Sequence, residues 1–155
     1  MNLEDYREFV LENIFFNDLK KLNLGQIQLK KTSTLNRYLY KSKGFKILKW
    51  HFMPEVIFLI IYGENKIFVE SNEKLIKGLG KFSNIITLKL NFNILKKREN
   101  SLRIKRSITL GIKKTPKLLR FIPIEILKKL LSEALDLIAK RVDKKLALKL
   151  SQVSQ

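Results

Sequence analysis

A chain of 155 residues with 45% apolar and 30% charged residues has the length and composition of a single globular domain, not of a disordered protein. It contains no cysteine, which excludes disulfides, thiolate metal sites and cysteine nucleophiles and is typical of a reducing compartment. The acidic N-terminus is not followed by a long apolar segment, so we expect no secretory signal and a cytoplasmic location.

The formal net charge of the chain is +18. Such an excess predicts an anionic partner, namely RNA, an acidic protein or an anionic membrane surface. The composition slightly favours AT-rich coding as the explanation, because only seven of the basic residues are arginine and lysine is enriched together with isoleucine, asparagine and phenylalanine. The longest apolar run, Val56 to Tyr62, is too short to cross a bilayer, so no transmembrane segment is expected.

The first part of the chain, residues 3–22, is predicted to form one bent helix or two short ones. Its apolar residues recur at helical spacing, at Leu3, Tyr6, Phe9 and Val10. Extended chain is expected over residues 26–40. We expect strands over Phe45–Met53 and Val56–Tyr62, a turn at residues 63–65, a returning strand over Lys66–Glu70, and a short bulged strand over Lys74–Lys81.

The clearest strands follow, over Ile86–Ile94 and Leu102–Ile112, where apolar and polar residues alternate with period two. This alternation predicts an antiparallel sheet that is covered on one face only. After Pro123, apolar residues recur every three or four positions on one stripe of a long helix, at Leu127, Leu131, Leu135 (or Ala134), Ile138, Val142 and Leu146.

This order of elements predicts an α+β fold, in which an antiparallel sheet of about six strands grips one long C-terminal helix, with short N-terminal helices. We expect a single domain over residues 1–155. Its short helices are expected within residues 3–22, the sheet within 26–113 and the long helix over 123–150.

Residues for catalysis are scarce. His51 is the only histidine, and its position between Trp50 and Phe52 of a predicted strand favours a structural role over that of a general base. We identify no catalytic residues, no clustered metal ligands and no cofactor motif, and we do not expect an enzyme.

Arg106 has the same parity as Ile104 and Ile108, so a regular strand directs it toward the face covered by the helix. A guanidinium there needs a partner, because a buried unpaired charge is very costly. Two alternatives are open. Arg106 meets a polar group of a ligand, or it pairs with Asp136 or Glu133 of the helix or reaches solvent at the sheet edge.

The outward face of the last two strands and the residues after them form a basic surface. Its members are Lys89, Arg103, Lys105, Lys113 and Lys114. Such a surface can follow phosphates, but it contains no aromatic residue on which bases would stack. The pattern favours a solvated lysine-rich sheet face over a phosphate-binding surface.

The chain resembles the START-like (SRPBCC) helix-grip superfamily, and within it an uncharacterised cyanobacterial and plastid family. The resemblance rests on WHFMPEVIFLI (50–60), IKGLGKFSNIITLKLNFNIL (76–95) and LGIKKTPKLLRFIPIEIL (110–127). It implies a lipid, isoprenoid or pigment held between sheet and helix, and for a plastid member a stromal location. Helix-grip domains usually open with a strand, whereas residues 3–22 here read as helical.

The leading hypothesis is therefore a small non-catalytic helix-grip protein that binds an apolar or amphipathic ligand. The residues expected to face this ligand are Leu90, Phe92, Ile108, Leu110, Leu131, Leu135 and Ile138, with Arg106 at its polar end. The alternative is a basic binding module that docks on RNA, an acidic protein or an anionic membrane surface.

Overall fold

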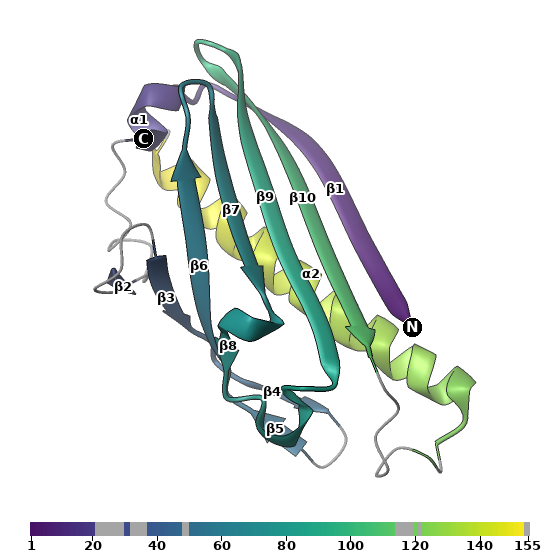
Figure 1. Ribbon diagram of the computed structural model, residues 1–155. Helices are drawn as coiled ribbons and strands as arrows, with labels where there is room; N and C mark the ends of the chain where they lie inside the picture. Colours follow the sequence, from purple (N-terminus) through teal and green to yellow (C-terminus); the bar gives the residue numbers. More distant parts are fainter. Residues whose placement is uncertain (21–29, 32–36, 48–49, 114–119, 121, 154–155) are drawn as a thin grey trace.

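The computed structural model describes residues 1–20, 30–31, 37–47, 50–113, 120 and 122–153. Over these residues one curved antiparallel sheet lies against one long helix, α2 (Ile124–Val153), which crosses it diagonally (Figure 1). This confirms the α+β class, with an antiparallel sheet and a long C-terminal helix. The expected helix boundaries, 123–150, agree with the observed ones to within three residues.

The described strands are β1 (Asn2–Glu12), β2 (Lys30–Lys31), β3 (Arg37–Lys41), β4 (Phe45–Ile47), β5 (Trp50–Phe52), β6 (Glu55–Tyr62), β7 (Lys66–Asn72), β8 (Ile76–Lys77), β9 (Ile86–Arg98) and β10 (Ser101–Ile112). Within the described ranges the main sheet has eight strands in the order β1-β10-β9-β7-β6-β3-β2, with β8 paired to β6. The β4 and β5 strands form a separate hairpin.

The prediction of short helices over residues 3–22 is wrong for its first half. Residues Asn2–Glu12 form β1, which pairs with β10 along its whole length. Residues Phe16–Lys20 are helical, as α1, and residues 21–22 lie outside the described part of the chain. The inward side chains of β1 are Leu3, Asp5, Arg7, Phe9 and Leu11. Because two of these five are charged, the period-two pattern of a strand is hidden in the sequence.

Two further predictions are corrected in detail. The single strand expected over Phe45–Met53 is two short strands, β4 and β5, and residues 48–49 between them lie outside the described part of the chain. The bulged strand expected over Lys74–Lys81 contains only the two residues of β8, between the 3-10 helices η2 (Glu73–Leu75) and η3 (Gly80–Phe82). Gly78 has a φ of +88°, a conformation that favours glycine and ends β8.

Helix α2 has 30 residues and is therefore about 45 Å long. The backbone N–H of Leu127 donates to the carbonyl of Pro123, so the proline immediately precedes the first helical residue. The predicted stripe faces the sheet: Leu127, Leu131 and Leu135 are buried, and Ala139 joins them. The sheet and α2 thus enclose one apolar layer between them.

Glu73 fastens the connection between β7 and β9. Its carboxylate accepts a hydrogen bond from the backbone N–H of Leu88 and lies 3.2 Å from Nζ of Lys113. Burial opposes ionisation of this carboxyl, but hydrogen bonds from the backbone N–H groups of Glu73 and Leu88, and from Lys113, outweigh it and lower the pKa of Glu73.

A lowered pKa in the folded state means that ionised Glu73 stabilises the fold above its ordinary pKa, and that this contribution is lost as the pH falls through the folded-state pKa. We expect Glu73→Gln to be less stable than the wild type at neutral pH. The difference should shrink between about pH 5 and pH 3. Urea unfolding of both proteins across this range measures it, and a difference that does not depend on pH would contradict this role.

Candidate functional site

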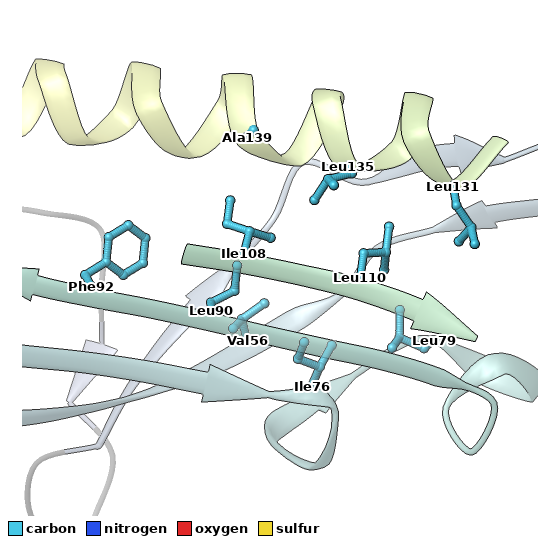
Figure 2. Packing of buried hydrophobic residues seen from close by; sticks show 10 residues of the cluster. All are labelled: Val56, Ile76, Leu79, Leu90, Phe92, Ile108, Leu110, Leu131, Leu135 and Ala139. Atoms are coloured by element: carbon cyan, nitrogen blue, oxygen red, sulfur yellow. The ribbon is translucent and has the colours of Figure 1, made fainter. Parts of the chain in front are cut away.

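The residues predicted to face a ligand come together in one apolar layer between α2 and the sheet. Figure 2 shows Leu131 and Leu135 of α2 directed toward Ile108 and Leu110 of β10. Six of the seven predicted apolar residues belong to this buried cluster, and Ile138 packs against it half-buried. The cluster also contains residues that were not predicted, namely Val56, Ile76, Leu79 and Ala139.

Helix α2 covers the sheet unevenly. It approaches the backbone most closely over β1 and β10, where the side chains of Ile104 and Ile108 are fully buried. On the opposite half of the same face, Phe58 of β6 and Val69 of β7 are only half-buried, and Tyr62 of β6 is 40% exposed. The inward side chains of β1 are half-buried or exposed as well, so partly exposed apolar surface lies along both sides of the layer.

Arg106 points toward the helix, as its parity predicted, and only 2% of its side chain is exposed. Its Nε lies 2.7 Å from Oδ1 of Asp143 on α2, and its Nη2 donates to Oδ2 of the same carboxylate at 3.1 Å. Its Nη1 donates to the carboxylate of Asp5 on β1 at 2.7 Å. The guanidinium is thus held by two carboxylates from two different elements.

Arg7 completes this charge network. It is the register partner of Arg106 across β1 and β10, and its Nη1 donates to Oδ2 of Asp143 at 3.0 Å. Two arginines and two aspartates therefore form a network without net charge that links β1, β10 and α2. Its members are Asp5, Arg7, Arg106 and Asp143, and we call it the arginine–aspartate network.

An ion pair between Arg106 and the helix was one of the two alternatives, but the partner is neither Asp136 nor Glu133. Residues Leu110 and Ile108 lie beneath the first half of α2, so Arg106, further back along β10, lies beneath the second half, where Asp143 is found. The inward direction of Asp5 and Arg7 could have been predicted from the sequence, because both have the same parity as the apolar residues Leu3 and Phe9.

The predicted basic surface is not uniformly basic. Arg103 lies 3.3 Å from a carboxylate oxygen of Glu8 on β1, and Lys105 is the register partner of the same glutamate. Lys113 pairs with Glu73. Lys89 is exposed, and Lys114 lies outside the described residues. The glutamates of β1 thus interleave with the basic side chains of β10 and reduce the positive charge of this face.

Residues suited to catalysis or metal binding do not gather in the described part of the chain. His51 is exposed on the β4–β5 hairpin opposite Lys46. Among the described side chains there is no group of three or more histidine, aspartate or glutamate residues placed to hold a metal ion. The helices described here include none that combines the length and apolar character needed to span a bilayer.

Comparison with known proteins found no matching family model and no matching curated protein. One solved structure to which the chain is similar is a START superfamily protein from Mycobacterium smegmatis, at 14% identity, with 98% of each chain covered and a TM-score of 0.47. The order of elements in the present chain is that of a helix grip: a strand, a short helix, a series of antiparallel strands and a long C-terminal helix.

The arginine–aspartate network predicts a large cost for removing its buried member. In Arg106→Met the carboxylates of Asp5 and Asp143 lose their shared partner, and we expect the free energy of unfolding to fall by about 3 kcal/mol. Arg103→Met is the matched control, because Arg103 sits three residues earlier on β10 in an exposed pair. Its loss should cost less than about 1 kcal/mol. Urea denaturation compares them, and equal costs would contradict the structural role of the network.

Proposed function

We propose that this protein is a non-catalytic helix-grip protein that binds an apolar or amphipathic ligand, such as a lipid, an isoprenoid or a pigment, between its sheet and α2. The observation that carries the proposal is the single apolar layer in which six of the seven residues expected to face a ligand are clustered. This layer lies between the sheet, whose strands fall within residues 2–112, and α2, which begins at Ile124.

In this proposal the ligand contacts both walls of the layer. The wall formed by the sheet contributes Leu90, Phe92, Ile108 and Leu110, and the wall formed by α2 contributes Leu131, Leu135 and Ile138. Arg106 lies beyond the apolar residues, at the polar end of this region. Because Asp5 and Asp143 already engage its guanidinium, it would act on a ligand mainly by holding α2 over the sheet.

The side of β3 and β6 offers a route for the ligand. Ile104 and Ile108 of β10 are fully buried beneath α2. The half-buried side chains of Phe58 and Val69 offer apolar surface on the side of β6 and β7. Burial of such surface by an apolar chain contributes about 25 cal/mol per Å². In this proposal the ligand enters on the side of β3 and β6, where this apolar surface adjoins the half-buried Tyr38 and Tyr40.

The test is native mass spectrometry of the freshly purified protein, with solvent extraction of what co-purifies. We expect a discrete bound apolar molecule in the wild type. Ile138→Trp should reduce its occupancy severalfold, because the larger ring fills space on the helix wall that the ligand needs. Leu137→Trp is the matched control, since Leu137 is the neighbouring residue on the exposed side of α2.

Thermal unfolding adds a second readout, because a ligand bound only by the folded protein raises its midpoint. Extraction of the ligand should lower the midpoint of the wild type and change that of Ile138→Trp less. A wild-type protein with no bound molecule, whose midpoint does not respond to added apolar ligands, would overturn the proposal.

A further inference from the structure

Two cationic side chains of α2 lie one turn apart on the side of the helix that faces β3. Nη1 of Arg141 donates to the backbone carbonyl of Gly44, just after β3, at 2.7 Å. Nζ of Lys145 donates to the hydroxyl of Tyr40 on β3 and lies 3.7 Å from the centre of its ring. Both cations therefore stand at the β3 side of the apolar layer.

Among the described residues, neither cation has a carboxylate partner. The described part of the chain includes all 14 aspartate and glutamate side chains, and within it none lies within ion-pair distance of Arg141 or Lys145. The arginines of β1 and β10 are arranged differently, since Arg7, Arg103 and Arg106 each meet a carboxylate. The β3 side of the apolar layer therefore carries positive charge that no carboxylate of the described residues neutralises.

The stability of α2 does not account for this placement. Like charges four residues apart on a helix are mildly destabilising. The favourable effect of a cation on the helix dipole is confined to the last turn, whereas Lys145 is two turns before the end at Val153. Lys145 is also half-buried, so part of its stem and amine is removed from water by Tyr40 and its surroundings.

Three tyrosine hydroxyl groups belong to the same side of the apolar layer. Tyr38 and Tyr40 have the same parity on β3 and face α2, and Tyr62 of β6 lies on the same face. Burial, the nearby Tyr38 and a hydrogen bond with its hydroxyl raise the pKa of Tyr62 to about 12. Tyr62 therefore remains protonated at neutral pH. Together with Lys145, these residues present polar hydrogens that suit an acceptor group with negative charge.

Apolar surface continues inward from this polar edge. Tyr38 and Leu146 pack together with Val69 against the buried cluster around Ile60 and Ile67. Val69 and Leu146 also pack against the cluster that contains Leu90 and Leu135. A molecule whose polar end met Lys145 would thus have continuous apolar side chains in front of its other end.

We propose that Lys145, with Tyr40, binds the anionic head, a carboxylate or a phosphate, of an amphipathic ligand whose apolar chain lies between α2 and the sheet. This inference rests on the proposed function and adds the charge and the orientation of the ligand. Arg141 stands beside the head and positions the turn at Gly44. Lys145 supplies a charge-assisted hydrogen bond, and Tyr40 holds its amine at the edge of the layer.

The experiment compares three probes that share one hydrocarbon chain, namely oleate, oleyl phosphate and oleyl alcohol. Binding is measured by native mass spectrometry and by calorimetric titration, below the concentrations at which the probes aggregate. We expect the wild type to bind at least one of the two anions on the order of tenfold more tightly than the alcohol. Which anion binds more tightly distinguishes a carboxylate head from a phosphate head.

Lys145→Met should remove this preference and leave the affinity for oleyl alcohol unchanged, because methionine keeps much of the apolar stem. Lys144→Met is the matched control: it removes the same charge from the neighbouring, exposed position and should keep the preference. Lys145→Arg should also keep it, and Tyr40→Phe should reduce it. Circular dichroism of each variant establishes that it is folded.

The outcomes separate the two proposals. If the alcohol binds as tightly as both anions, or if Lys144→Met and Lys145→Met lose the preference equally, the polar site is overturned while the apolar layer stands. If the wild type binds none of the three probes, the proposed function itself fails. Loss of the preference in Lys145→Met alone, with the alcohol still bound, supports both.

Discussion

The ion pairs of Arg106 are the interaction on which the rest of the structure depends. A guanidinium with 2% exposure in an apolar layer is tolerated only because Asp143 and Asp5 lie within 3 Å of it. These contacts determine which part of α2 lies over β10 and bring β1 to the edge of the sheet. The position of every apolar residue on the stripe of α2 follows from that alignment.

Alignment along one edge explains why the two halves of the inner face differ. The arginine–aspartate network holds α2 to β1 and β10. On the other side the helix meets β3 through longer side chains, those of Arg141 and Lys145. Hydroxyl and amine groups thus lie along the β3 side of the layer, and the fully apolar contacts lie deep inside it.

Sequence patterns predicted the parts of this structure in which one simple periodicity is present. Alternation over Ile86–Ile94 and Leu102–Ile112 identified β9 and β10, and the stripe from Leu127 to Leu146 identified α2. The same approach failed for β1, because its inward positions include Asp5 and Arg7. Their inward direction is explained by their ion pairs with Arg106 and Asp143, which are more than 90 residues away in the sequence. A polar edge built by Tyr40 and Lys145 is equally invisible in sequence, since its two members meet only in the fold.

The pairing of β1 with β10 has a consequence for how this protein is made. Residues in register, such as Arg7 and Arg106, are separated by most of the chain, so β1 leaves the ribosome long before its partner exists. Until then the segment that becomes β1 has no strand with which to pair. Its outward glutamates, Glu4, Glu8 and Glu12, together with inward Asp5 and Arg7, keep this waiting segment charged on both faces. The charges that align the finished fold are thus also a protection of the nascent chain against association with other strands.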